Sequence, residues 1–302
     1  MACKGLANKW VISTLRCVAA LGLLAGLAMP VRAESLPAPT RLDMLGTRQL
    51  VVSDPLRDAI FVLNAGSLAI EREIPVQGDA LSVAYSRGRI YVGNATRQTV
   101  EVRTRSGGHR FDLGGEGSVA RPLDIAVDSG KGWVFVVDGA SNQIKVFSVR
   151  GALEFTLPAP GMPPLEGPAA LAVDPLREEV LVSEYGKPGG FAPKAWLRIY
   201  GYDGTLHGAI SGRQHPGFGF SRPQGLAVSP TGLIFLVDAV RAQVLVFDRG
   251  TLLPMGVIGA AGHGAGELFF PLDAALDESG QRLFVTNKGG MRVDAYDALT
   301  WR

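Results

Sequence analysis

The feature that most constrains the fold is a strand phrase that recurs along the chain. Each copy is about five residues long, is rich in Val, Ile, Leu and Phe, and ends in Asp, Asn or Glu. Such runs, bounded by Gly, Pro, Asp or Ser, are typical of short β-strands joined by turns. The six copies cover residues 60–64, 90–94, 134–138, 180–184, 234–238 and 283–287.

The spacing of these copies predicts the architecture. Their last residues lie 30, 44, 46, 54 and 49 positions apart, and a period near 45 residues is that of a four-stranded propeller blade. No helix of ordinary length fits between the strands. The sequence therefore predicts an all-β, six-bladed β-propeller over residues 34–302, with a small first blade that has lost or fused one strand.

A second phrase precedes four of the strands and carries a family resemblance. It has the form Pro-x-x-x-Ala-x-Asp or Ser and starts at Pro122, Pro168, Pro223 and Pro271. This phrase resembles the inner strand of NHL-repeat blades, Pro-x-Gly-Ile-Ala-Val-Asp. Residues 61–66 and 74–78 look more like the related YVTN propeller repeats. The resemblance implies a propeller fold and by itself implies no activity.

The repeat also assigns roles to particular segments. Segment 41–46 resembles outer strands such as 254–259, and we expect it to complete the last blade and close the ring, which removes an exposed edge. Segment 185–195 lengthens the turn after the second strand of the fourth blade, either as a binding loop or as a neutral insertion. Small residues at matching inner-strand positions let the sheets approach near the axis: Ala84, Ala126, Ala172, Ala227 and Ala275.

The first 33 residues have the pattern of a secretory signal peptide. Lys4, Lys9 and Arg16 precede the apolar run 17–29, and Val31-Arg32-Ala33 offers small residues for cleavage. Thirteen apolar residues span about 20 Å as a helix, less than the roughly 30 Å of a bilayer core. We therefore expect a secreted or periplasmic protein with no membrane span after cleavage.

Charge and cysteine content narrow the class of partner. The leader holds four of the 30 basic residues and none of the 28 acidic ones, so its removal changes the formal net charge from +2 to −2. A chain without clustered cations has no electrostatic support for binding nucleic acid. Both cysteines, Cys3 and Cys17, lie in the leader as well. We expect a monomer that is stabilised by burial rather than by disulfides.

The inner strands offer candidate site residues where NHL blades carry glycine. Aligning the six units places these residues at matching positions: Leu50, Ser82, Asp124, Ala170, Gly225 and Asp273. Asp124 and Asp273 are three units apart, so their carboxylates should face one another across the axis. Helped by Ser82, they could hold a hard cation such as Ca²⁺. Alternatively, they are solvated channel residues or turn caps.

Other polar side chains are expected around the same channel mouth. Arg121 and Arg222 each precede the proline that opens an inner strand, and the arginine fork suits a carboxylate or another anion. The alternative for each is an ordinary ion pair with an acidic neighbour. Glu184, at a strand end, and His263, in a glycine-rich connection, complete the predicted ligand-binding set.

No standard catalytic motif occurs in the sequence. Some NHL-type propellers are amidating lyases with zinc on three axial histidines, whereas only His215 and His263 are expected near this mouth. The sequence thus favours an exported, non-catalytic scaffold that binds a protein segment or small ligand at the channel mouth, with no cofactor other than possible Ca²⁺. The alternative is a metal-dependent hydrolase or lyase that uses the axial pair Asp124 and Asp273.

Overall fold

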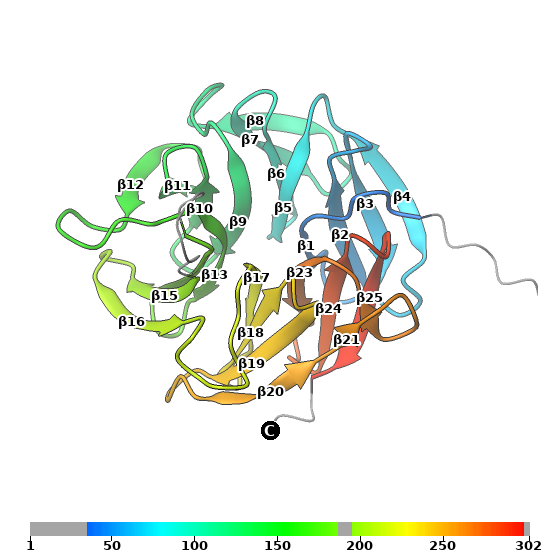
Figure 1. Cartoon of the computed structure of the whole chain (residues 1–302). Helices are drawn as coiled ribbons and strands as arrows, with labels where there is room; N and C mark the ends of the chain where they lie inside the picture. The colour runs from blue at the N-terminus through cyan, green and yellow to red at the C-terminus, as the bar shows by residue number, and fades with distance from the viewer. Residues whose placement is uncertain (1–34, 187–194, 299–302) are drawn as a thin grey trace, which may run out of the picture. The chain divides into compact units, whose positions relative to one another are not determined.

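The computed structural model describes residues 35–186 and 195–298, and every regular element in this part of the chain is a β-strand. The strands form six antiparallel blades around an axis, which confirms the predicted six-bladed β-propeller (Figure 1). Within each blade, consecutive strands pair with one another. The predicted signal peptide and the core of the long loop, residues 187–194, lie outside the described residues.

The strands follow chain order from the axis outward. The first blade holds β1 (Leu42–Met44), β2 (Gln49–Asp54), β3 (Ala59–Asn64) and β4 (Ile70–Pro75). The second holds β5 (Ala80–Ser86), β6 (Arg89–Asn94), β7 (Thr99–Thr104) and β8 (His109–Leu113). The third holds β9 (Pro122–Asp128), β10 (Trp133–Asp138), β11 (Gln143–Ser148) and β12 (Leu153–Leu157).

The second half of the ring follows the same plan with one exception. The fourth blade holds β13 (Pro168–Asp174), β14 (Glu179–Glu184), β15 (Trp196–Gly201) and β16 (Leu206–Ser211). The fifth holds β17 (Pro223–Val228), β18 (Leu233–Asp238), β19 (Gln243–Asp248) and β20 (Pro254–Ile258). A short parallel pair, β21 (Ala260–Ala261) and β22 (Glu267–Leu268), precedes the last blade, which holds β23 (Pro271–Leu276), β24 (Arg282–Asn287) and β25 (Arg292–Asp297).

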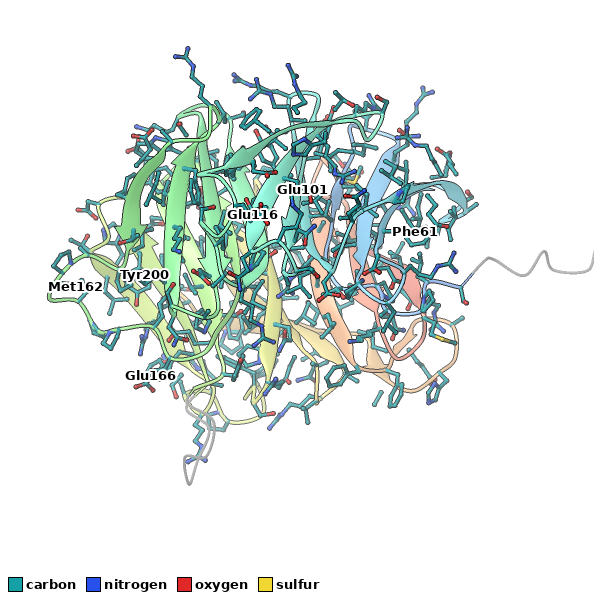
Figure 2. All side chains as sticks on the ribbon, turned by 90° about the horizontal axis from the view of Figure 1, so that it is seen from above. Phe61, Glu101, Glu116, Met162, Glu166 and Tyr200 are labelled. Atoms are coloured by element: carbon teal, nitrogen blue, oxygen red, sulfur yellow. The ribbon has the colours of Figure 1, made fainter. Side chains whose placement is uncertain are left out.

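The hydrophobic core lies between the blades rather than at the axis. Six clusters of buried apolar side chains fill the six spaces between neighbouring sheets. Second strands such as β14 and β18 are buried along their whole length because a sheet covers each of their faces. Phe61 and Tyr200, both fully enclosed, lie toward opposite sides of the ring (Figure 2). The matching inner-strand alanines are buried or half-buried, which fits their predicted packing role.

In the third and fifth blades, the Asp at the end of the second strand holds the following turn. Asp138 Oδ1 accepts hydrogen bonds from the backbone N–H of Ala140 and of Arg121. Asp238 Oδ1 accepts in the same way from Val240 and Arg222. Each carboxylate therefore ties its own turn to the segment that enters the blade.

The register predicted for the first blade is wrong by one strand. Residues 60–64 belong to β3, the third strand, and the second strand is β2, which ends at Asp54. The first blade therefore has four strands and is not reduced. Its innermost strand, β1, is only three residues long and lacks the Pro-x-x-x-Ala phrase. The repeated phrase therefore starts the first blade one strand too late, at β2 instead of β1.

The predicted closure of the last blade by segment 41–46 is also wrong. This segment contains β1, which pairs with β2 and lies at the axis as the innermost strand of the first blade. Among the described residues the last blade keeps three strands, β23, β24 and β25. The chain still joins the two ends of the ring, because Leu36 N donates to Met291 O and Thr286 Oγ1 donates to Thr40 O.

Candidate functional site

One residue from each blade occupies an equivalent place on the axis, and the structure corrects the first of them. Each of these residues lies opposite the penultimate residue of its second strand, as Asp124 lies opposite Val137 and Asp273 opposite Thr286. In the first blade the matching residue is Arg41, whose N–H and C=O bond to Ser53. Leu50, the predicted member, lies in β2 inside the core. The axial residues are therefore Arg41, Ser82, Asp124, Ala170, Gly225 and Asp273.

Arg41 places a cation between the two predicted carboxylates. Its guanidinium lies 3.5 Å from Asp124 Oδ1 and 3.8 Å from Asp273 Oδ1, and all three side chains are buried. It also donates to three backbone carbonyls of other blades, those of Leu123 at 3.0 Å, Leu272 at 2.8 Å and Ala169 at 2.6 Å. Asp124 and Asp273 do converge, and the Arg41 side chain lies between them.

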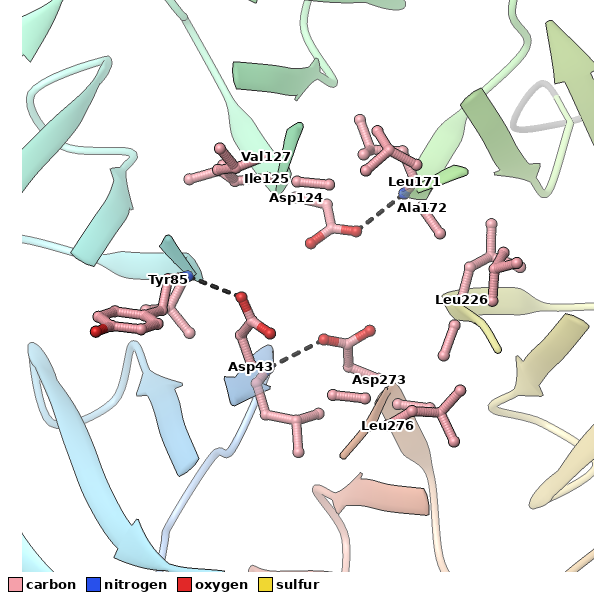
Figure 3. A pocket seen from close by; sticks show the side chains of 18 of the residues that line it. Asp43, Tyr85, Asp124, Ile125, Val127, Leu171, Ala172, Leu226, Asp273 and Leu276 are labelled. Carbon is pink, nitrogen blue, oxygen red and sulfur yellow. Dashed lines mark hydrogen bonds between the residues drawn. The ribbon is translucent and has the colours of Figure 1, made fainter. Parts of the chain in front are cut away.

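Beyond Arg41 the axis opens into a cavity of about 350 Å³, here called the acidic cavity (Figure 3). Asp43 faces it together with Asp124 and Asp273, and its carboxylate accepts hydrogen bonds from the N–H groups of Tyr85 and Met44. Asp277 and Glu278 also line this cavity. Asp124 and Asp273 thus share one guanidinium at the axis, and the Asp43 carboxylate lies on the cavity beside them.

Burial governs the protonation of this cluster. Burial raises the pKa of Asp43 to about 6, against the lowering effect of its two backbone hydrogen bonds. Burial likewise raises the pKa of Asp124, with Arg41 opposing the shift. It raises the pKa of Asp273 well above its ordinary value, and Asp124 adds to that shift while Arg41 opposes it. A proton is therefore held in this cluster more readily than on surface carboxylates.

On the other side of Arg41, at the starts of the inner strands, lies a second cavity of about 200 Å³, here called the arginine mouth. Arg121 and Arg222 line it and both are exposed. The Arg222 guanidinium lies 4.1 Å from the ring centroid of Tyr185. Within residues 35–186 and 195–298, no carboxylate lies within 4.0 Å of either guanidinium. The structure thus brings Arg121 and Arg222 together on one cavity, without the acidic partner that the alternative interpretation expected.

The other predicted site residues lie elsewhere. Ser82 Oγ is buried and donates to Pro122 O at 2.9 Å, which links the second blade to the third. Glu184 is buried at the end of β14, where its Oε2 accepts from Glu166 N and Arg198 Nη1, and burial raises its pKa to about 7. His263 is exposed between β21 and β22, its ring 4.5 Å from that of Phe269. None of the three lines the arginine mouth or the acidic cavity.

Sequence reasoning missed the residues that organise the axis. From the sequence alone, Arg41 and Asp43 belong to an outer strand, and Tyr185 is only part of a long loop. The sequence does contain a signal for these residues. In a strand, the alternation Arg41-Leu-Asp43 directs two charged side chains to one face, while the adjacent residues Leu42 and Met44 are apolar. The described residues contain no group of three or more His, Cys, Asp or Glu side chains arranged for a metal. Calcium binding at Asp124 and Asp273 stays a prediction.

Comparison with protein-family models and with curated proteins finds no match to the sequence. In the described part of the chain no helix is long and apolar enough to cross a membrane. Solved structures do match. A chain of Kuenenia stuttgartiensis hydrazine synthase matches 90% of this chain and 80% of its own length, with a TM-score of 0.62 and 15% sequence identity.

A chain from the crystal structure of a nidogen/laminin complex matches 85% of this chain and 91% of its own length, with a TM-score of 0.67 and 18% identity. Identities this low show a shared fold and no more. This protein is therefore similar to both in architecture, and its function has to be argued from its own site.

Proposed function

We propose that this protein is an exported, non-catalytic recognition scaffold whose arginine mouth binds a carboxylate of a protein segment. The observation that carries the proposal is the pair Arg121 and Arg222, two exposed guanidinium groups on one small cavity. Neither is neutralised by an acidic side chain among the described residues. Arginine presents a planar set of donors that matches a carboxylate, often through two parallel hydrogen bonds.

The geometry of the mouth favours a small anionic group on a larger molecule. A volume of about 200 Å³ is that of roughly seven water molecules at about 30 Å³ each, enough for one acidic side chain. Tyr185 adds an apolar wall, and its contact with Arg222 holds that guanidinium at the rim. Arg41 closes the floor, but its donors contact three carbonyls and its charge is paired with Asp124 and Asp273, so the two exposed arginines carry the binding.

Two further considerations support a protein segment rather than a free metabolite. The sequence predicts a signal peptide, and a protein exported to the cell envelope or outside the cell would meet other exported proteins there. One structural neighbour comes from a complex of two proteins, nidogen and laminin. That neighbour's complex supports a protein as the partner proposed for this chain.

The proposal is tested with two short peptides that differ by one group. Acetyl-Gly-Ser-Glu-Ser-Gly-amide should bind the full chain with a Kd of about 1 mM, which corresponds to roughly 4 kcal/mol from two charge-assisted contacts. The matching glutamine peptide should bind at least tenfold more weakly. Chemical-shift titration or calorimetry measures both affinities.

Chain variants decide whether the arginine mouth is responsible. Arg121→Ala with Arg222→Ala should abolish binding of the glutamate peptide, whereas Arg87→Ala with Arg150→Ala removes two other exposed arginines and should leave the Kd unchanged. Raising the salt concentration should weaken binding, because the contacts are charged and exposed. Equal binding of the two peptides, or full binding by the Arg121/Arg222 variant, would exclude the proposal.

A further inference from the structure

A further cavity, here called the interblade cavity, lies between the second and third blades and has a volume of about 210 Å³. It is at the ends of the inner strands β5 and β9, whereas the arginine mouth is at the starts of the inner strands. The two cavities share no lining residue and are on opposite faces of the ring. The polar residues that line the interblade cavity are Ser86, Arg87, Arg89, Tyr91 and Ser129.

The hairpin between β5 and β6 brings two guanidinium groups to this cavity. Ser86 pairs with Arg89 across the hairpin, so their side chains lie on one face of the sheet. Tyr91, two residues further along β6, shares that face and is buried against the third blade. The turn consists of Arg87 and Gly88, whose φ angles of 45° and 80° are both positive, as a tight two-residue hairpin turn requires.

Arg89 is half-buried and held in place by the third blade. Its Nη1 donates a hydrogen bond of 2.7 Å to Val149 O. Burial raises the pKa of Tyr91, and the positive charge of Arg89 opposes that shift, so the guanidinium lies close to the phenol. A cation fixed in this way loses little side-chain freedom when a ligand binds, which favours binding.

The interblade cavity carries positive charge without a neighbouring carboxylate. No acidic residue lines it. In residues 35–186 and 195–298, no carboxylate lies within 4.0 Å of the Arg87 or Arg89 guanidinium. Asp128, which precedes Ser129 in the chain, accepts hydrogen bonds from the N–H groups of the next turn and from a tyrosine hydroxyl. The two arginines therefore keep their charges available for an anion.

The remaining part of the sequence supplies no acidic side chain for this cavity either. Glu34 is the one acidic residue outside the described ranges. It is two positions from Leu36, whose N–H bonds to Met291 O in the last blade. Consecutive Cα atoms are about 3.8 Å apart, and the side chain of Leu36 packs between the last and first blades. Glu34 is thus too close to the last blade to reach the space between the second and third.

We propose that the interblade cavity binds a phosphate group, either as inorganic phosphate or as a small phosphate ester. Phosphate carries up to two charges and three or four acceptor oxygens, and arginine binds it through pairs of parallel hydrogen bonds. The hydroxyls of Ser86 and Ser129 add two donors, and neither has a hydrogen bond within the described residues. A carboxylate, with one charge and two oxygens, uses fewer of these donors.

The size of the cavity favours a small soluble ligand. A volume of about 210 Å³ is that of roughly seven water molecules at about 30 Å³ each, enough for one phosphate group and a few waters. The arginines and serines surround a recess between two sheets, and Tyr91 is only 1% exposed. Because this cavity and the arginine mouth are on opposite faces, phosphate binding here is independent of carboxylate binding at the mouth.

Calorimetric titration of the full chain with inorganic phosphate at low salt tests the proposal. One phosphate should bind per chain with a Kd of about 1 mM or lower. Acetate should bind at least tenfold more weakly, because it has half the charge and fewer acceptor oxygens. Glycerol 3-phosphate distinguishes the two sources of the group. Binding as tight as that of inorganic phosphate would assign the site to esters, and much weaker binding would assign it to the free ion.

Two variants of the same size test whether the interblade cavity is responsible. Ser129→Glu places a carboxylate beside the two arginines and should weaken phosphate binding at least tenfold, whereas Ser129→Gln adds no charge and should change the Kd less than about threefold. Arg89→Gln should also weaken binding at least tenfold, and Arg110→Gln on β8, an exposed arginine outside the cavity, should not. The melting temperature of each variant checks its folding, and the Ser129 pair decides the question if Arg89→Gln is unfolded.

Several results would overturn the proposal. Absence of saturable phosphate binding, equal affinity for acetate, or equal phosphate affinity of Ser129→Glu and Ser129→Gln would show that the interblade cavity is no phosphate site. Phosphate binding that is lost in Arg121→Ala with Arg222→Ala but kept in Ser129→Glu would place the anion at the arginine mouth instead. Cosedimentation with phosphatidylcholine vesicles that contain phosphatidic acid, without binding of either soluble phosphate, would show that the ligand is a membrane surface.

Discussion

At the scale of single residues, Arg41 decides what the centre of the ring can do. It supplies internally the positive charge that Asp124 and Asp273 would otherwise take from solution. Its other donors contact carbonyls from the third, fourth and last blades, so one side chain connects three separate sheets. A buried ion pair costs much desolvation energy, and removing one partner leaves the other charge uncompensated.

Arg41→Gln should therefore lower the free energy of unfolding by about 3–5 kcal/mol at pH 7.5. Adding Asp124→Asn to this variant should recover part of the loss, because it removes one of the two buried carboxylates that no longer have a counter-charge. Urea denaturation of the single and double variants measures both effects. A loss below about 1 kcal/mol for Arg41→Gln would mean that the axial charge contributes little to stability.

Because Arg41 supplies the counter-charge of Asp124 and Asp273, Ca²⁺ binding should depend on Arg41. The unaltered chain should bind no stoichiometric Ca²⁺, whereas Arg41→Ala leaves Asp124 and Asp273 facing an open space that a cation with oxygen ligands could occupy. Calorimetric titration with Ca²⁺ measures this, with Arg41→Ala/Asp273→Asn as the control that removes a ligand. Tight binding by the unaltered chain would instead support the predicted axial metal site.

The raised pKa of Asp43 predicts a pH dependence with a definite sign. Its folded pKa of about 6 lies above the ordinary value of 3.8, so the folded state holds the proton more tightly than the unfolded state. Stability from this group is therefore full below about pH 4 and is lost as the pH rises through 6. Asp43→Asn removes the ionisation. The melting temperature of this variant minus that of the unaltered chain should therefore be larger at pH 7.5 than at pH 4.5.

Exposed Glu116→Gln is the matched control for Asp43→Asn, because it removes a carboxylate that lies on an exposed loop. Differential scanning calorimetry at the two pH values gives the comparison. The assignment fails if the difference between Asp43→Asn and the unaltered chain is the same at both pH values.

At the scale of strands, inner-strand packing sets which residues the axis tolerates. Gly225 in β17 lies against Asp273 in β23, and a Cβ atom at Gly225 would overlap both the backbone and the carboxylate of Asp273. The approach of these two strands therefore requires glycine at this position.

Gly225→Ala should accordingly destabilise the protein by about 1–3 kcal/mol, because overpacking forces two inner strands apart. Gly208→Ala is the matched control. Its new methyl group on β16 would meet only side-chain ends, the closest at 3.3 Å, so we expect a change within about 1 kcal/mol. Equal melting temperatures for the two variants would contradict the packing argument.

The sequence predicted most strands correctly and failed where the strand signal is shortest. Val134–Asp138 and its counterparts are long, β-branched and closed by a polar cap, so their period revealed the blades. β1 has three residues, and its role depends on partners such as Leu272 and Ala169, which are more than 100 positions away in the chain. No local pattern reports such contacts. Asp124 and Asp273 could be placed on the axis from the repeat alone, whereas their partner Arg41 could not.

At the scale of the whole molecule, the N-terminal segment joins the two ends of the ring. Five of the six spaces between blades hold a buried Leu or Ile from a fourth strand. The space between the last and first blades holds buried Leu36 and β1 side chains, with Ile70 of β4 only partly buried beside them. The N-terminal segment bonds to the last blade through Leu36, Thr40 and Leu42, the last of which donates to Asp273. Closure thus combines β1 at the axis with the bond from Leu36 to the turn before β25, and the last blade keeps three strands among the described residues.

This arrangement predicts how much the N-terminal segment contributes to the ring. Deleting residues 34–46 removes Arg41 together with four apolar side chains that are nearly inaccessible, each of which contributes about 1.5–3 kcal/mol through burial: Leu36, Leu42, Met44 and Leu45. The melting temperature should fall by at least 10 °C, since about 1 kcal/mol corresponds to roughly 2–4 °C in a domain of this size. Leu36→Ala keeps Arg41 and should cost about 2–4 kcal/mol, a smaller loss. If the deletion costs no more than Leu36→Ala, then β1 and Arg41 do not close the ring, and closure has to come from the outer edge of the last blade.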